Sequence, residues 1–490
     1  MKYILICALF SPMVYLAFRQ KKWYLFLLFG LMGVLPEQFS IEIHEVLPMV
    51  SATRILIVVA MSFWAYDKWK TRKFTWPVSL LIFLGVNILI SIINLRFGAD
   101  EFNRMFRFVF ERVVFAIVVM DLITSKEEFE KCIDFMIMGS VILAVIGISQ
   151  TVYNYDIASV LHLSETLSSI MLTDRMGLIR AYGTYNAISY GCYCAFMMLL
   201  IYYKMENSSN KFYTLAMALN FVAMICTLSR SAWLCILGTA FLIFLTRPAR
   251  VIRKVWVSLV LVIVITVGLA FAQPKLSDAL LETSKSTINT VLRVLPEDWL
   301  QPEKPTEPTI TTPTQTEPAP TQTEPAPTQT DPTENKEPGF ELSDEFGYNG
   351  DRAAQSRLFQ WSVVRYMMMD GNLLFGYGYN ALPEGKIHYD VSPNADLGWW
   401  SQMNTVDVGL VGVIVESGIV GLLATLCLFA YIFIQSLRKW KRGLVFDFYK
   451  MAVFMVPLLL LLNFMASFMH DHVVWMFIAL YYAYEHLEEN

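Results

Sequence analysis

Long apolar segments recur along almost the whole chain, and they argue against a soluble fold. Of the 490 residues, 56% are hydrophobic and only 16% are charged. A helix needs about 20 apolar residues to cross the hydrocarbon core of a bilayer, and several segments approach this length. We therefore expect an all-α, polytopic membrane protein with about 12–13 transmembrane helices. The expected spans are residues 3–18, 23–35, 46–66, 77–95, 106–123, 132–152, 186–203, 212–228, 232–246, 255–272, 408–434, 451–468 and 473–486.

Basic residues collect in alternate connections between these spans, and they predict the orientation. The basic clusters are "RQKK" (19–22), "DKWKTRK" (67–73), "RPARVIRK" (247–254) and "RKWKR" (438–442). Lys and Arg accumulate in short cytoplasmic loops, so we expect these clusters inside the cell. The intervening loops then face outward, including the long stretch 273–407.

Arg230 lies in "CTLSRSAWLCILG" (226–238), inside an apolar run where a guanidinium is unexpected. An arginine stays charged in a protein and is expensive at the bilayer centre, by roughly 3 kcal/mol on insertion scales. One continuous helix through Arg230 would put the cluster 438–442 outside, whereas two helices keep the alternation unbroken. We therefore expect a turn at Arg230 near the outer face.

Three parts of the chain follow from this topology: membrane helices over 1–272, an extracytoplasmic loop over 273–407, and C-terminal membrane helices over 408–490. Within the loop, residues 302–338 contain a Pro/Thr/Glu repeat with almost no apolar side chains, which predicts a disordered spacer. Residues 351–382 show apolar positions at helical spacing, which predicts an amphipathic helix.

Arginines on the outward-facing side form a candidate phosphate-binding set. A planar guanidinium with five donors suits phosphate oxygens, and several of them suit a diphosphate. Salt bridges to Glu111, Asp174 or Glu384 are the structural alternative. The set consists of Arg104, Arg107, Arg112, Arg175, Arg180, Arg230, Arg352, Arg357 and Arg365.

Four ordered motifs resemble the bacterial O-antigen ligase and polymerase family. "RMGLIRAYGTYNAISYG" (175–191) resembles the Arg, Gly, aromatic and Asn stretch that precedes a membrane helix in these proteins. "LSRSAWL" (228–234) resembles their Ser-Arg turn, and "SRLFQWSVVRYMMMDGNLLFGYGYN" (356–380) resembles part of their large periplasmic loop. "ESGIVGLL" (416–423) is similar to the start of the helix after that loop. The resemblance implies a polytopic fold like that of GT-C glycosyltransferases.

Two features favour the polymerase branch of this family over the ligase branch. Its polymerases often carry an Arg and a Gly separated by ten residues in two external loops, and Arg180 with Gly191 and Arg365 with Gly376 fit this spacing. Its ligases usually place His-Asn nine residues before "GxxG". Asp407 and Val408 stand there instead, so the ligase histidine is absent.

The resemblance implies extracytoplasmic glycosyl transfer from a polyprenyl-diphosphate-linked oligosaccharide to a saccharide acceptor, at the plasma (inner) membrane of a bacterium. It implies an inverting displacement that needs no metal or other cofactor, because arginines neutralise the leaving diphosphate. We expect Asp407 and Arg230 to be catalytic, with Asp407 as the general base or as the group that orients the acceptor hydroxyl. A helix N-cap is the structural alternative for Asp407. The expected substrate-binding residues are Arg180, Arg357, Arg365, Asn186 and Glu416.

Besides the two substrates and the bilayer, a flippase and a chain-length regulator are candidate partners, and we expect no nucleic acid. A ligase and a transporter or flippase of lipid-linked saccharide are the alternatives, although no internal repeat supports a transporter. A metal-dependent glycosyltransferase using Glu37, Glu42 and Glu45 ranks lower. The "HDH" turn at 470–472 fits a proton relay, a metal site or simply a wet turn.

Overall fold

The computed structural model describes residues 11–17, 19–35, 40–41, 50–71, 76–95, 108–156, 174–175, 178–185, 187–246, 248–294, 372–378, 409–440, 446–465 and 471–489. The chain divides into two compact units, residues 1–283 with 356–490, and residues 284–355. The first unit holds nearly all of the described residues.

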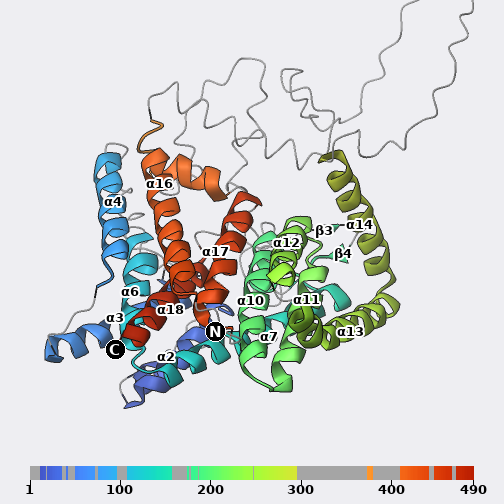
Figure 1. The fold of residues 1–490 in the computed structure, drawn as a ribbon, viewed down its shortest axis with the longest axis horizontal. Helices are drawn as coiled ribbons and strands as arrows, with labels where there is room; N and C mark the ends of the chain where they lie inside the picture. The colour runs from blue at the N-terminus through green and yellow to red at the C-terminus, as the bar shows by residue number, and fades with distance from the viewer. Residues whose placement is uncertain are drawn as a thin grey trace, which may run out of the picture. The chain divides into compact units, whose positions relative to one another are not determined.

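Helices dominate the described residues, which confirms the expected all-α fold (Figure 1). Two short antiparallel ribbons accompany them, β1 (Ser40–Ile41) with β2 (Val50–Ser51) and β3 (Asp174–Arg175) with β4 (Leu178–Ile179). The helices are α2 (Lys21–Met32), α3 (Ala52–Thr71), α4 (Val78–Asn94), the π-helix η2 (Val109–Val114), α6 (Phe115–Leu122), α7 (Lys126–Tyr153), α10 (Ala187–Asn207), α11 (Lys211–Cys226), α12 (Arg230–Thr246), α13 (Pro248–Ala272), α14 (Pro274–Val294), α16 (Gly409–Arg438), α17 (Phe448–Met465) and α18 (His472–Glu489).

Four of these helices are long and apolar enough to cross a bilayer: α7, α10, α16 and the part of α13 from Val251 to Ala272. Shorter apolar helices lie at Val78–Asn94, Lys211–Cys226, Arg230–Thr246 and Phe448–Phe464. The protein is therefore a polytopic membrane protein.

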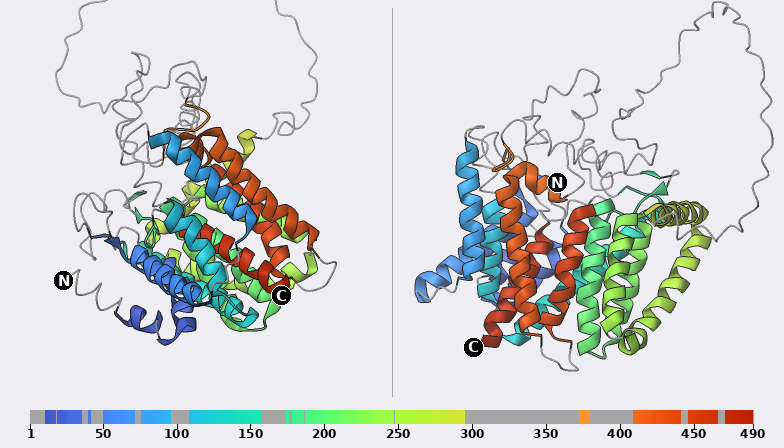
Figure 2. Two further views of the ribbon diagram at one scale, coloured as in Figure 1. Left: turned by 90° about the vertical axis from the view of Figure 1, so that its left-hand side faces the viewer. Right: turned by 45° about the horizontal axis from the view of Figure 1, so that its top comes forward.

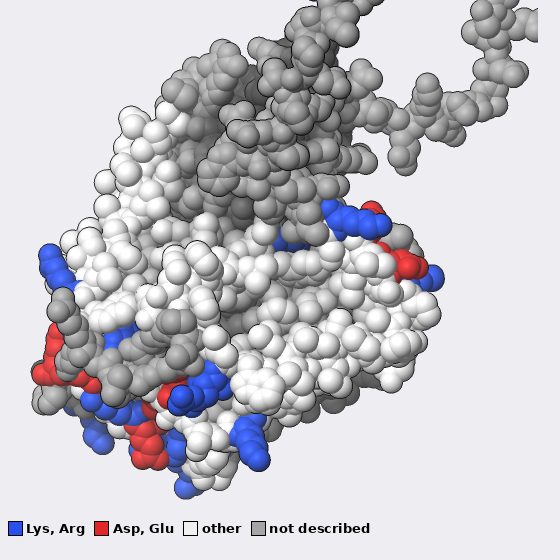
Figure 3. All heavy atoms as spheres, turned by 45° about the vertical axis from the view of Figure 1, so that its right-hand side comes forward, with Lys and Arg blue, Asp and Glu red and all other residues white. Residues whose placement is uncertain are grey.

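The central and peripheral spans differ in what surrounds them. Helix α10 is buried on nearly all sides and packs against α7, α11, α12 and α17 (Figure 2). Helix α13 instead exposes large apolar side chains such as Trp256, Ile263 and Phe271, as a lipid-facing helix does. Figure 3 shows charged side chains gathered near the margins of one face, with a broad uncharged zone between them.

Ion pairs tie the basic clusters together at one end of the bundle, here called the basic end. Lys21 pairs with Asp67 at 2.9 Å and so joins the first two clusters. Lys254 of the third cluster donates to the Met205 carbonyl, beside Lys204, which pairs with Glu130 at 2.7 Å. The remaining links are Lys22 to Glu128, Lys68 to Asp121, Lys126 to Glu488 and Lys439 to Glu485. The alternation of clusters along the sequence therefore corresponds to one common end.

Helix α14 is an element that the sequence analysis missed, because residues from 273 onward were treated as loop. Pro274 suits the first helical position, where its missing N–H leaves no bond unmade. Leu276, Ala279 and Thr283 are fully buried, whereas Leu281 is exposed. The stretch 274–294 therefore forms an amphipathic helix directly after the apolar α13.

Candidate functional site

A break between α11 and α12 separates the apolar run into two helices, as expected. Thr227 ends α11 because its Oγ1 donates to the Met224 carbonyl at 2.7 Å and accepts the Ser229 N–H at 3.1 Å. Leu228 adopts a left-handed conformation with φ of 52°. Arg230 is the first residue of α12 and is half-buried. Helix α11 starts beside the basic end, so this break lies toward the opposite end of the bundle.

Residues 178–185 form hydrogen bonds to the backbone at this break. The Arg180 Nε donates to the Thr227 carbonyl at 2.6 Å, and the Ala181 N–H donates to the Cys226 carbonyl at 3.0 Å. These bonds satisfy two of the carbonyl groups that a helix C-terminus leaves without partners. The structure thus brings Arg180 to the turn where Arg230 begins the next helix.

Gln150 of α7 fixes the position of this closing segment. Its Oε1 accepts the N–H groups of Tyr182 at 3.2 Å and Gly183 at 2.8 Å, and its Nε2 donates to the Gly183 carbonyl at 3.0 Å. Gly183 has a φ of 57°, a conformation that favours glycine. The hydroxyl of Tyr182 donates to the buried Asp156. Arg180 is therefore held by a segment with several buried anchors.

Gly191 lets α10 approach the same turn closely. A Cβ at Gly191 would lie 3.0 Å from the Ala232 Cβ and 3.1 Å from the Ser229 Cβ. Gly191, which ten residues separate from Arg180, thus has a packing role, because it admits the turn that carries Arg230.

Helix α16 contains a second interruption, at Gly418, where φ is 67° and ψ is −169°. The expected span 408–434 is confirmed as α16, and the kink within it was not expected. Residues 372–378 insert there. The Tyr377 and Gly378 N–H groups donate to the carbonyls of Val415 and Glu416 at 2.8 and 2.9 Å. On the other side of the kink, the Ile419 and Val420 N–H groups donate to the carbonyls of Leu373 and Leu374 at 2.9 and 3.1 Å.

The two glycine motifs therefore form one interlock, defined here as residues 372–378 with 415–420. A Cβ at Gly376 would lie 2.6 Å from the Glu416 carbonyl carbon, and one at Gly418 would lie 2.2 Å from the Leu374 oxygen. Asn94 of α4 adds a further bond, because its Nδ2 donates to the Phe375 carbonyl at 2.8 Å.

Glu416 lies in this interlock, and its side chain is half-buried. Lys439 follows α16 at the basic end, where it pairs with Glu485 at 2.8 Å. Because more than twenty helical residues separate Glu416 from Lys439, Glu416 lies toward the opposite end, as Arg180 and Arg230 do. Asp407, Asn186, Arg357 and Arg365 lie outside the described residues, as does the expected amphipathic helix before residue 372. Their roles stay predictions.

A buried charged cluster that the sequence analysis did not assemble lies on α3, η2 and α18. The Arg54 Nε pairs with the Glu111 Oε1 at 2.6 Å, and the Arg112 Nη1 lies 3.9 Å from the Glu111 Oε2. Arg112 also contacts the Nε2 of His472, which is buried. The sequence did contain a signal for this cluster, because Glu111 and Arg112 are charged residues inside an apolar run. Charged residues within a membrane segment indicate a functional site by default. We call these four residues the Arg112 cluster.

The "HDH" turn gains a partial explanation from this cluster. Asp471 caps α18, because its Oδ1 accepts the Val473 N–H at 3.0 Å, while His472 points to Arg112. His470 lies outside the described residues. Within the described part of the chain, no group of His, Cys, Asp and Glu is arranged to hold a metal ion.

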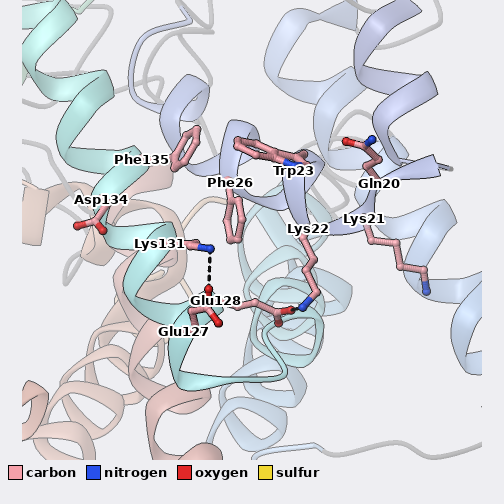
Figure 4. Close-up of a pocket in the computed structure, with 10 residues that line it drawn as sticks. All are labelled: Gln20, Lys21, Lys22, Trp23, Phe26, Glu127, Glu128, Lys131, Asp134 and Phe135. Carbon is pink, nitrogen blue, oxygen red and sulfur yellow. Dashed lines mark hydrogen bonds and ion pairs between the residues drawn. The ribbon is translucent and has the colours of Figure 1, made fainter.

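A pocket of about 530 Å³ lies at the basic end, between the start of α2 and the start of α7 (Figure 4). Four of its charged side chains pair with each other: Lys22 lies 2.7 Å from Glu128, and Lys131 lies 2.7 Å from Glu127. The hydrogen bond and the charge of Glu128 raise the pKa of Lys22. The pocket lies at the end of the bundle opposite to Arg180 and Arg230, so it is not part of the candidate site.

The fold and the two interrupted helices define a polytopic membrane protein with arginines placed at a helix break. Residues 215–426 match the sequence model of the O-antigen ligase family, Wzy_C. The chain therefore carries an O-antigen ligase family domain, and this family transfers glycans in surface polysaccharide synthesis. Both interruptions, at 227–229 and at 418, fall within the matched residues, whereas Arg180 and the Arg112 cluster lie outside them. No curated protein matches the chain.

Proposed function

We propose that this protein polymerises repeat units of a surface polysaccharide, such as O-antigen, capsule or exopolysaccharide. It transfers a glycan from a polyprenyl-diphosphate-linked donor to a saccharide acceptor on the outer side of the membrane. The observation that carries this proposal is the meeting of Arg180 and Arg230 at the α11–α12 break. Arg230 begins α12, and the start of a helix favours anions, while Arg180 adds a second guanidinium at the same turn.

The chemistry suits such a site because the lipid diphosphate is already a good leaving group. The protein has to position two substrates and to stabilise the charge that develops on the departing phosphate. Guanidinium groups do this without a proton transfer, since they stay charged. The acceptor hydroxyl attacks the anomeric carbon from the face opposite to the diphosphate, so a single displacement inverts that centre. No metal ion is needed in this scheme.

The other expected residues complete the proposed site. Arg357 and Arg365 join Arg180 on the diphosphate and the glycan, and Asn186 donates to sugar hydroxyls. Asp407 orients or deprotonates the attacking hydroxyl at the mouth of α16. Glu416, half-buried in the interlock, binds the glycan or pairs with one of the arginines.

The outward orientation of this site rests on the charge distribution. The four basic clusters share the basic end, and short basic loops stay in the cytoplasm. The α11–α12 break and the interlock lie toward the opposite end, which we therefore assign to the outer side of the membrane.

Arginine-to-lysine substitutions test the proposal, because lysine keeps the charge but loses the planar fork. The full chain is purified in detergent and incubated with a lipid-linked repeat unit, and the chain length of the product is measured on gels. We expect Arg180→Lys and Arg230→Lys each to slow transfer by about 10- to 100-fold, as for the loss of a charged hydrogen bond. The control Lys21→Gln, which alters a half-exposed pair at the basic end, retains the wild-type rate.

The outcomes separate the competing functions. Full activity in both arginine variants refutes the diphosphate site. New glycosidic bonds in detergent, where no membrane barrier exists, exclude a pure transporter. Products that grow by repeat units on a lipid-linked acceptor indicate a polymerase, whereas a single transfer to a different acceptor indicates a ligase.

A further inference from the structure

The Arg112 cluster lies toward the same end of the bundle as Arg180 and Arg230 but on different elements. Helix α18 ends at the basic end, where Glu488 pairs with Lys126, so His472 at its start lies at the opposite end. The segment that carries Arg180 reaches α10 through Tyr185, which stacks on Tyr193 with ring centroids 5.4 Å apart. The two groups of cations therefore lie toward the same end of the bundle on separate elements.

The cluster places two guanidinium groups beside one carboxylate, and an imidazole beside one of the guanidinium groups. Glu111 lies against both arginines, at 2.6 Å from the Arg54 Nε and 3.9 Å from the Arg112 Nη1. The side chain of Arg112 is only 9% exposed, whereas that of Arg54 is 23% exposed. The cluster therefore extends from a buried guanidinium to a partly accessible one, as a site open on one side does.

The Nε2 of His472 lies against the Nη1 of Arg112. A guanidinium carries only donors and stays charged, whereas an imidazole donates or accepts according to its tautomer. The two arginines therefore supply permanent hydrogen-bond donors for an anion, and the ring of His472 lies beside one of them.

The backbone that carries Arg112 supports a functional role. Residues Val109–Val114 form a π-helix, a rare conformation that occurs frequently at functional sites. Charged side chains within apolar membrane segments likewise mark substrate or ion sites by default. Here both features occur in the same six residues.

We propose that Arg54, Arg112 and His472 form a second anion site, which holds the diphosphate of the lipid-linked acceptor. This inference rests on the proposed polymerase function. If each repeat unit arrives on a lipid diphosphate, a polymerase meets two such groups at once. The donor's diphosphate leaves, and the acceptor's diphosphate stays attached to its glycan. Two polyanions at one membrane face repel each other and need two separate sets of cations.

Equilibrium binding of geranylgeranyl diphosphate to the full chain in nanodiscs tests this second site. By calorimetry we expect the wild type to bind two equivalents. Arg54→Gln, at the accessible edge of the cluster, weakens one of them by about 10- to 100-fold, and Arg230→Lys weakens the other. Arg54→Lys, which keeps the charge, gives an intermediate loss and serves as the second variant if Arg54→Gln does not fold. Lys21→Gln at the basic end keeps both equivalents.

Transfer kinetics give an independent readout. Arg54→Gln raises the KM for the lipid-linked acceptor about tenfold or more and leaves the KM for the donor unchanged. A role limited to stability would lower the melting temperature and affect both substrates alike, and that result overturns the proposal. Two equivalents bound with wild-type affinities by Arg54→Gln, or one equivalent bound by the wild type, also overturn it. Binding that depends on Arg54 in a protein without transferase activity supports the anion site while refuting the polymerase function.

Discussion

The interlock at Gly418 predicts that a single methyl group will release the segment 372–378. In Gly418→Ala, the new Cβ would lie 2.2 Å from the Leu374 oxygen and 2.3 Å from the Leu374 carbonyl carbon. Both atoms belong to the backbone, so no side-chain rotation can relieve the clash. The backbone at Gly418, with φ of 67° and ψ of −169°, is also in a region that is nearly restricted to glycine.

Two free-energy costs determine how far Gly418→Ala destabilises the closed interlock. Keeping the wild-type conformation costs about 1–3 kcal/mol of backbone strain, before the clash is counted. Releasing the segment instead breaks the four hydrogen bonds across the kink, each worth about 1 kcal/mol net. We therefore expect the closed interlock to lose roughly 3 kcal/mol, which is an increase of more than a hundredfold in its open population.

Hydrogen–deuterium exchange of the full chain measures this opening. The amides of Tyr377, Gly378, Ile419 and Val420 should lose about two orders of magnitude of protection in Gly418→Ala. Gly238→Ala is the matched control, because this glycine also lies in an apolar helix and a Cβ there meets no atom within 4 Å. Equal protection of the four amides in both variants would refute the interlock as described.

Three further predictions concern the other parts of the site. Gln150→Leu removes three hydrogen bonds to Tyr182 and Gly183, so we expect a lower melting temperature and a rate of glycan transfer reduced at least tenfold; an unchanged rate contradicts the anchoring role of Gln150. Gly191→Val places a branched side chain within about 3 Å of Ala232 and Ser229, so transfer should fall together with thermal stability, whereas a fully active variant would show that α10 and the turn can separate. Excess chelator should leave the transfer rate of the wild type unchanged, because arginines neutralise the diphosphate in the proposed mechanism, and loss of turnover that added Mg²⁺ restores would contradict it.

The helices and the break at Arg230 could be predicted from the sequence because each depends on local information. Apolar length gives the spans, and a charge within such a run, combined with the alternating basic clusters, requires a turn. The structure confirms the two helices on either side of Thr227–Ser229. Arg180 and Arg230 were expected in one phosphate-binding set, but the hydrogen bond that joins Arg180 to the Thr227 carbonyl was not expected.

The interlock and the Arg112 cluster could not be predicted in this way, because each joins residues far apart in the chain. "GYGYN" and "ESGIVGLL" were both identified as motifs, but glycine inside an apolar helix does not by itself indicate a kink. The kink depends on hydrogen bonds to a segment about forty residues earlier. Likewise, Arg112 and His472 are separated by 360 positions, and neither residue predicts its partner.

The two interruptions together bear on where charged substrates can reach the protein. Lipid offers no hydrogen bonds, so non-helical backbone at membrane depth persists only where protein covers it or where it lines a water-filled cavity. Here residues 180–181 complete the break after Cys226, and residues 373–378 complete the kink at Gly418. Both covering segments come from connections that we assign to the outer side, and both interruptions lie toward the same end of the bundle. At both places the polar backbone is therefore covered by protein rather than by lipid, and Arg180 is itself part of this cover.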